Sequence, residues 1–242
     1  MRNPCWVLLL FAFFSRPMLA QQEHMLYKAS MIQAAPGKLL ELIDLEKKIT
    51  AEAQKSPGDP LPLWMRHSQG DRWDLLILYP VGSYAEYYRP ERADKREKLA
   101  LGSQEALQQD IAWQEDVFVQ GPALASLHKA CDGAGFFHVE MFEALPGKHQ
   151  ELVKQRMMEN VFSRTLKLPE NLIFVRDQGA AWDVITVGCY PDLKHYAEAS
   201  DVPPADAQAA AKAAGFESPA QIGPYLRTLI SLHRDTLAVA IR

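Results

Sequence analysis

Two short motifs occur twice in this chain, in the same order and at almost the same spacing. PGKLLEL begins at Pro36 and PGKHQEL at Pro146, which lie 110 positions apart (146 − 36). QGDRWD begins at Gln69 and QGAAWD at Gln178, which lie 109 positions apart (178 − 69). Chance seldom repeats two unrelated motifs at one offset. The sequence therefore predicts two copies of a unit of about 110 residues, and so long a period indicates tandem domains rather than a solenoid.

Hydrophobic periodicity and chain breakers give both copies the same order of elements. In the first copy we expect a strand at 25–33, which ends before Pro36, and then a helix with one apolar face. The other predicted elements of this copy are strands at 63–67, 73–79 and 116–120 and a helix at 83–109. In the second copy they are strands at 136–143, 172–176, 182–189 and 236–241 and a helix at 148–161. A short helix at 124–130 is predicted between the copies.

The order β-α-β-β-α-β is that of the ferredoxin-like fold, an antiparallel sheet with both helices on one face. The other face would leave a large apolar patch in water, which soluble monomers rarely do. We therefore predict an α+β protein in which two ferredoxin-like units pack sheet to sheet as a pseudo-dimeric α/β barrel. The predicted boundaries are a signal peptide at 1–20, a first unit at 21–121, a linker at 122–134, and a second unit at 135–242 with an Ala-rich insertion at about 202–215.

The first twenty residues have the pattern of a secretory signal. Arg2 precedes an apolar run of about ten residues, and Met18-Leu19-Ala20 forms a small-residue cleavage site. We expect cleavage near Ala20 and export to the periplasm or the extracellular space. A membrane anchor is the alternative, but the run is shorter than the roughly 18 to 20 residues of a spanning helix, and no later stretch is long enough. In an oxidising compartment Cys131 and Cys189 can pair, although their non-equivalent places in the two units argue against a bridge.

Charge and motif content exclude several classes of function. The net charge of −4 and an isoelectric point near 6.0 provide no basic field, so we predict no nucleic-acid partner. The chain has no Gly-x-Ser-x-Gly elbow, no His-Glu-x-x-His motif and no Gly-rich dinucleotide loop. Two cysteines without an accompanying histidine spacing are not a zinc signature, so the sequence predicts no metal site.

A strand, then Pro-Gly-Lys opening a helix, then a hairpin into a strand that begins with Trp-Asp and ends near Tyr79 resembles the dimeric α/β-barrel superfamily. The NIPSNAP-like and antibiotic-biosynthesis-monooxygenase-like members are the most similar. The resemblance covers roughly 25–120 and 135–242 and implies the barrel fold. It also implies that a ligand would lie between sheet and helices or inside the barrel. Such proteins include monooxygenases without a cofactor, haem proteins, isomerases and proteins without known chemistry, and no motif here selects among them.

One strand of the second unit carries the leading candidate site. Its residues alternate between two faces. Phe137, Val139 and Met141 are predicted to meet the helices. Phe136, His138, Glu140 and Phe142 are predicted to face the barrel interior, and the first-unit equivalents of the middle pair are Lys28 and Ser30. A histidine near its free pKa suits proton transfer, so His138 is a candidate base and Glu140 its partner. The alternative is a charged pair that only orients the two units.

His233 is the candidate for a haem ligand. With Leu226, Leu229 and Ile230 it follows helical spacing, so we expect it on the apolar face of a last helix. A histidine in that place can be an axial ligand of haem iron. The alternative is a core or capping histidine near the negative end of the helix dipole. We predict no other cofactor.

Unequal residues at equivalent positions point to the second unit as the one with a pocket. Tyr79 is replaced there by Gly188, which predicts open space, and Arg176 stands where the first unit has His67. The doubled pairs Trp73-Asp74 and Trp182-Asp183 instead indicate structure. We expect each indole to lie under the helices and each carboxylate to cap its hairpin.

These observations predict an exported protein that binds a small, partly apolar molecule in the second unit. Predicted ligand contacts are Phe136, Phe142, Lys28, Ser30, Arg176 and His233. As an enzyme it would be a monooxygenase or isomerase without a cofactor, with His138 and Glu140 as its catalytic pair. The alternatives are a non-catalytic binding or assembly module, with the charged segment 89–98 as its contact, and a haem-binding protein. The two units of one chain would form a pseudo-dimer, and the sequence does not determine whether chains assemble further into homo-oligomers.

Overall fold

The computed structural model describes residues 24–55 and 60–241, so the predicted signal peptide lies outside the described residues. The first unit contains β1 (Met25–Ala34), α1 (Leu39–Ala53), β2 (Leu63–Gln69), β3 (Leu75–Gly82), α2 (Tyr84–Tyr87), α3 (Pro90–Asp110) and β4 (Ile111–Gly121). After α4 (Leu124–Cys131), the second unit contains β5 (Phe136–Ala144), α5 (His149–Thr165), β6 (Leu172–Gln178), β7 (Val184–Tyr190), α6 (Leu193–Ala197), α7 (Pro204–Ala213), α8 (Ile222–Arg227) and β8 (Ile230–Ala240). Two short 3-10 turns, η1 (Glu198–Asp201) and η2 (Pro219–Gln221), flank α7.

The element order matches the prediction, with corrections at three places. The helix predicted at 83–109 is two helices, because Pro90 cannot continue α2 and instead begins α3. The strands β4 and β8 begin earlier than predicted, at Ile111 and Ile230. His233 therefore lies on β8 and not on a helix, so the helical spacing of its apolar neighbours was a misleading signal. The Ala-rich insertion is helical as expected, and its Ala211 packs with Phe216 in a small cluster.

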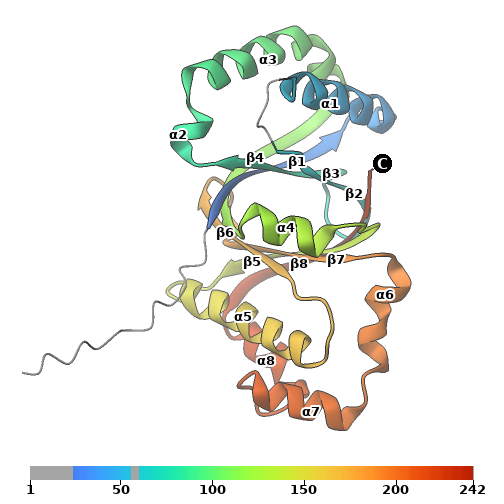
Figure 1. Ribbon diagram of the computed structural model, residues 1–242, viewed down its shortest axis with the longest axis vertical. Helices are drawn as coiled ribbons and strands as arrows, with labels where there is room; N and C mark the ends of the chain where they lie inside the picture. The colour runs from blue at the N-terminus through green and yellow to red at the C-terminus, as the bar shows by residue number, and fades with distance from the viewer. Residues whose placement is uncertain (1–23, 56–59, 242) are drawn as a thin grey trace, which may run out of the picture.

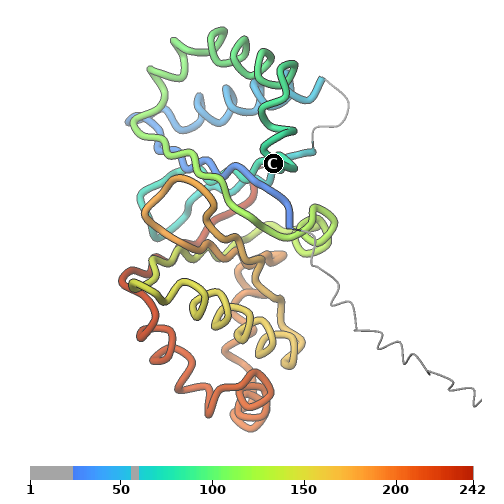
Figure 2. Tube along the Cα trace, turned by 90° about the vertical axis from the view of Figure 1, so that its left-hand side faces the viewer, coloured from blue at the N-terminus to red at the C-terminus, as the bar shows by residue number. Residues whose placement is uncertain are grey.

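The strands form a closed antiparallel barrel in the order β1-β3-β2-β8-β5-β7-β6-β4. Pairing of β2 with β8 and of β4 with β6 joins the two units. Figure 1 shows α1 and α3 on one side of the strands and α5, α7 and α8 on the opposite side, and the view in Figure 2 keeps the same layers. The predicted pseudo-dimeric α/β barrel with helices outside is confirmed.

The barrel interior is a packed apolar core with contributions from both units. Tyr27, Met31 and Met65 of the first unit meet Phe137 and Phe174 of the second in one cluster. The facing predicted for β5 was therefore wrong. Phe137, Val139 and Met141 point into the barrel, and the face that carries His138 and Glu140 points toward α5. The reason is that two sheets bury each other's inner face completely, so that face takes the apolar set.

The doubled Trp-Asp motif is a structural device, as predicted. Asp74 donates its backbone N–H to Ile32 O at 2.8 Å, and its Oδ2 accepts from the Ala34 N–H at 2.8 Å. Asp183 repeats both bonds, to Phe142 O at 2.7 Å and from the Ala144 N–H at 2.8 Å. Each carboxylate thus ties its hairpin to the end of a neighbouring strand. The position expected for the indoles was wrong, because Trp73 and Trp182 lie in the barrel core and not under the helices.

The glycine of each QG motif lies where one unit contacts the other. Gly70 has φ +127°, and a Cβ placed on it would be 2.2 Å from the backbone oxygen of Asp235 on β8. Gly179 has φ +91°, and a Cβ there would be 3.2 Å from the backbone oxygen of Asp116 on β4. The repeated glycines therefore let each hairpin approach the last strand of the opposite unit.

A disulfide joins Cys131, the last residue of α4, to Cys189 on β7, with 5.1 Å between the Cα atoms. The argument against this bridge was wrong. The helix α4 occurs once, between the units, so its cysteine needs no equivalent in the first unit. Figure 1 shows α4 between the two layers of strands, and Leu127 packs in the barrel core. Within 24–55 and 60–241, no helix is long and apolar enough to cross a membrane.

Candidate functional site

Each unit has a layer between its sheet and its helices, and the two layers carry different side chains at equivalent positions. In the first unit Lys28 and Ser30 lie on β1, Gln114 and Asp116 on β4, and Glu46 on α1. The second unit has His138, Glu140, His233, Asp235 and Arg156 at these five places. The strand register places Ser30 opposite Asp116 and Glu140 opposite Asp235. The duplication has therefore produced two sites of different charge.

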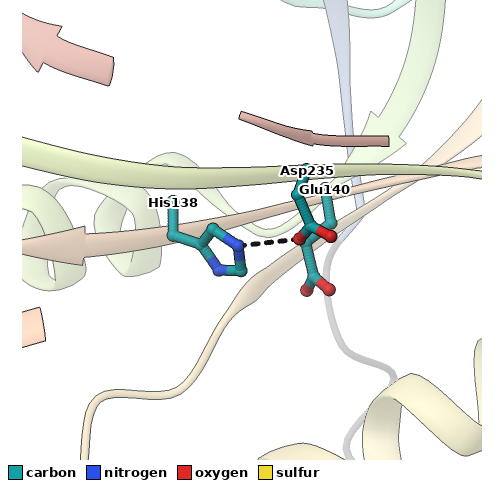
Figure 3. Close-up of side chains that lie close together, drawn as sticks. All are labelled: His138, Glu140 and Asp235. Atoms are coloured by element: carbon teal, nitrogen blue, oxygen red, sulfur yellow. Dashed lines mark hydrogen bonds and ion pairs between the residues drawn. The ribbon is translucent and has the colours of Figure 1, made fainter. Parts of the chain in front are cut away.

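The second-unit layer is a dense polar network around Glu140, which is 8% exposed. Its Oε2 accepts from Thr186 Oγ1 at 2.9 Å and from Arg156 Nη1 at 3.3 Å. Its Oε1 lies 3.1 Å from His233 Nε2. His138 Nε2 lies 3.0 Å from Asp235 Oδ1, the contact drawn in Figure 3. His138 and Glu140 thus share one face, as predicted, but each has another residue as its direct partner.

Charge sets the protonation of this network. Burial alone would raise the pKa of Glu140, but the hydrogen bond from His233 and the charge of Arg156 outweigh it and lower the pKa to about 2. Burial alone would lower the pKa of His138, but its bond to Asp235 and the charge of Glu140 raise it above its usual value. Glu140 is therefore a carboxylate held ionised, and it is a poor proton acceptor at neutral pH.

The surroundings of His233 do not fit a haem ligand. His233 Nε2, the atom that would bind iron, faces Glu140 Oε1 at 3.1 Å and Asp235 Oδ2 at 3.4 Å. The His233 ring stacks on the Phe142 ring with 4.6 Å between centroids. The Arg156 guanidinium lies over the same Phe142 ring. The iron-binding nitrogen of His233 is thus already faced by two carboxylates.

The polar layer of the first unit borders an open cavity. A cavity of about 340 Å³ extends between β1 and β3 on one side and α1 and α3 on the other. Its walls are mostly apolar, with Ile32, Ile49, Val81, Leu99 and Leu107 among them. No histidine or cysteine is among the described residues that line it. The space that Gly188 suggested is filled, because Tyr190 and Asn171 lie 2.8 Å from where its Cβ would be. The second unit has its open space elsewhere, in a pocket of about 1380 Å³ lined by α5 residues such as Val153 and by Ile173 of β6.

Lys28, Ser30, Glu46 and Tyr79 form one polar end of this cavity, and Arg92, Lys95 and Arg96 of α3 also line it. Lys28 Nζ lies 3.3 Å from Asp116 Oδ2 and 5.1 Å from the centre of the Tyr79 ring. Ser30 Oγ donates to Asp116 Oδ1 at 2.6 Å, and the Tyr79 hydroxyl lies 3.5 Å from Glu46 Oε2. Two of the predicted ligand contacts, Lys28 and Ser30, therefore line an open cavity.

The fold changes the pKa values of two cavity residues, Glu46 and Tyr79. Burial raises the pKa of Glu46 above the usual value, and the charge of Lys28 offsets part of this effect. Burial and the charge of Glu46 raise the pKa of Tyr79 well above its usual value. A carboxyl group with a raised pKa in a cavity suits general acid–base work. Sequence reasoning missed Glu46. Nothing in the sequence distinguishes this buried glutamate from the exposed glutamates on the same helix.

The other predicted contacts have structural surroundings. Phe136 lies 5.6 Å, between ring centroids, from Tyr196 of α6. Phe142 is fully buried in the cluster beneath α5. Arg176 Nη2 donates to Asp183 Oδ1 at 2.5 Å and so belongs to the hairpin of the second unit.

Replacing Glu46 with glutamine is expected to stabilise the free protein at pH 7. A carboxyl group with a raised folded pKa lowers stability once it ionises, so the penalty is absent below its ordinary pKa of 4.5 and appears as the pH rises through the folded value. Urea unfolding at pH 7 and at pH 4 should show the gain only at pH 7. Glu41→Gln, an exposed position on the same helix, is the control and should change stability by less than about 0.5 kcal/mol at either pH. A destabilised Glu46→Gln at pH 7 would contradict the assignment.

No protein-family model matches the chain, and no curated protein matches it in sequence. Solved structures do match its fold. An anthrone oxidase-like protein superimposes with a TM-score of 0.59 at 10% identity, covering 92% of this chain and 93% of the other. A proposed monooxygenase from Fusobacterium nucleatum gives 0.58 at 9% identity, covering 90% and 93%. A proposed chlorite dismutase gives 0.51 at 11% identity, covering 91% and 96%.

Proposed function

Because the chain has the fold of the dimeric α/β-barrel proteins, we propose that it binds a small, largely apolar molecule between the sheet and the helices of its first unit. The observation that carries this proposal is the cavity of about 340 Å³. Ligand sites in proteins begin at about 300 Å³ and combine apolar walls with a few polar groups. The first-unit cavity has both properties.

The polar end of the cavity indicates the chemistry of the ligand. Glu46 offers a buried carboxyl group, Tyr79 a hydroxyl and Lys28 a positive charge. Together they suit a ring-sized molecule with one acidic hydroxyl group, such as a phenol. Glu46 would accept the proton of that hydroxyl, and Lys28 would stabilise the anion that forms.

This proton transfer is a first step that a monooxygenase without a cofactor and an isomerase share. Among the structural neighbours are an anthrone oxidase-like protein and a proposed monooxygenase, which supports the oxygenase version at the level of fold. The catalytic pair His138 and Glu140 is less favourable, because the pKa of Glu140 is about 2 and its two oxygens already have partners. Glu46 takes that role in this proposal.

A tryptophan placed in the cavity tests the proposal. Ala53 of α1 lines the cavity, and Ser163 holds the equivalent place on α5, 110 positions later (163 − 53). Using 2-naphthol as the probe, saturation-transfer NMR should show binding to the wild type and to Ser163→Trp and at least a tenfold loss in Ala53→Trp. Native mass spectrometry of purified protein should show any co-purified ligand lost in the same variant.

Equal binding by Ala53→Trp and Ser163→Trp, with both variants folded, would place the ligand elsewhere. If the protein binds 2-naphthol but does not convert it, the result would favour the alternative of a non-catalytic binding module. The Soret region of the absorption spectrum of the same samples tests the haem alternative directly.

We also propose that the protein works in an oxidising compartment after export. The Cys131–Cys189 disulfide supports this, because such bonds persist outside the cytosol and are rare within it. The intact mass of the mature protein tests it, since cleavage near Ala20 would remove the first twenty residues.

A further inference from the structure

Four side chains of the kinds that bind metal ions converge in the second unit. One ligand atom each from His138, Glu140 and Asp235 lies within 4.8 Å of the others, and Figure 3 shows the three side chains side by side. His233 Nε2 joins them at 3.1 Å from Glu140 Oε1 and 3.4 Å from Asp235 Oδ2. The group therefore offers two imidazole nitrogens and two carboxylates.

Two neighbouring strands bring the group together. The strands β5 and β8 are antiparallel, with Glu140 opposite Asp235 and Phe142 opposite His233. His138 and Glu140 are two apart on β5, and His233 and Asp235 are two apart on β8, so all four share the face toward α5. Hydrogen-bonded strands hold such residues more firmly than loops do, which suits a binding site.

The spacing of the atoms fits a four-coordinate ion. In a tetrahedral site with metal–ligand bonds of about 2.0–2.2 Å, neighbouring ligand atoms lie about 3.3–3.6 Å apart. The separations are 3.0 Å for His138 Nε2 to Asp235 Oδ1, 3.1 Å for His233 Nε2 to Glu140 Oε1, and 3.4 Å for His233 Nε2 to Asp235 Oδ2. The ligand atoms of His138, Glu140 and Asp235 all lie within 4.8 Å of one another, so side-chain shifts of about 1 Å would place the four groups around one centre.

The two oxygens of Glu140 have different surroundings. Oε2 is held by Thr186 at 2.9 Å and Arg156 at 3.3 Å. Oε1 is directed to His233. Donors that fix one oxygen while the other faces a ligand position are the outer shell that orients metal-binding carboxylates. Arg156 is itself held by Gln155 and Glu159, so its position does not depend on Glu140 alone.

Charge in this layer favours a divalent cation. Glu140, Asp235 and Glu159 supply three carboxylates, and Arg156 supplies one guanidinium. Glu140 and Asp235 lie directly opposite each other, an arrangement that destabilises paired strands unless a positive charge lies between them. Asp235 is the exposed member, with 56% of its side chain accessible, and it leaves a path for an ion to enter.

We propose that His138 Nε2, His233 Nε2, Glu140 Oε1 and a carboxylate oxygen of Asp235 bind one divalent transition-metal ion. Mixed nitrogen and oxygen ligands in this number suit Zn²⁺. The site lies in the second unit, apart from the first-unit cavity, so either proposal can fail without the other. The equivalent positions of the first unit carry Lys28, Ser30, Gln114 and Asp116, which offer no imidazole.

Metal titration of the untagged full chain tests the site. After dialysis against EDTA, calorimetry with Zn²⁺ should show one strong site per chain, and Co²⁺ should give the visible absorption bands of a four-coordinate complex. Asp235→Asn should weaken Zn²⁺ binding at least about 100-fold, because loss even of an outer-shell partner costs 10- to 100-fold. Asp116→Asn, the equivalent position in the first unit, should leave the affinity unchanged.

A second variant, His233→Gln, keeps the test decisive if one substitution disturbs the strand. It should abolish the Co²⁺ bands while the circular dichroism of the metal-free protein stays that of the wild type. Absence of a strong site in the wild type would overturn the proposal. So would Zn²⁺ binding that survives in both Asp235→Asn and His233→Gln, since the ion would then be held elsewhere.

Discussion

Replacing Gly70 with alanine is expected to destabilise the protein by about 3 kcal/mol or more. The added Cβ would lie 2.2 Å from the backbone oxygen of Asp235 and 2.7 Å from the Cα of Thr236. Both obstacles are backbone atoms of β8, which is paired with β5 and cannot move aside alone. The φ of +127° adds strain for any residue with a side chain. The substitution would therefore separate a hairpin of the first unit from the last strand of the second.

Gly147→Ala is the matched control for this change. Gly147 also has a positive φ, +77°, but a Cβ there would meet nothing within 4 Å. Gly147→Ala should lower the free energy of unfolding by only about 1 kcal/mol, the cost of a positive φ for a residue with a side chain. Urea unfolding followed by circular dichroism measures both variants. Equal losses would mean that the close approach of Gly70 to β8 contributes nothing.

Replacing Arg156 with methionine is expected to cost about 3–5 kcal/mol, the second of the largest effects. The Arg156 side chain is 2% exposed and contacts Glu140 and Glu159, which are both largely buried. Methionine keeps much of the volume but leaves two carboxylates without their cation. Because they lie in a medium of low dielectric, their repulsion is poorly screened.

Arg164→Met on the same helix separates this effect from a general loss of charge. Arg164 pairs with Glu170 at 3.1 Å, but 61% of its side chain is exposed, so its loss should cost less than about 1 kcal/mol. The free energy of unfolding of both variants should be measured in urea with EDTA present, so that no bound metal ion contributes to it. Adding Glu140→Gln to Arg156→Met should recover part of the loss, and a double variant no more stable than the single one would contradict the argument.

The candidate site was predictable in parts. Alternation on one strand placed His138 and Glu140 on a common face, and the duplication paired them with Lys28 and Ser30. The facing of that strand was wrong because both faces of β5 are buried, and only the opposing sheet decides which of them meets the barrel core. The space expected at Gly188 is absent because Tyr190, two residues later, fills it.

The sequence by itself determined the plan of this molecule. Two repeated motifs implied two ferredoxin-like units, and their bare sheet faces implied a barrel, because local patterning and burial of apolar surface follow from the order of residues. Tertiary structure alone decided that Asp235 and His233 lie beside Glu140, since residues 93 and 95 positions apart (233 − 140 and 235 − 140) meet only through strand pairing. It likewise decided that Glu46 lies beside Tyr79 in an open cavity. Contacts between distant residues depend on register and packing, which no local pattern records.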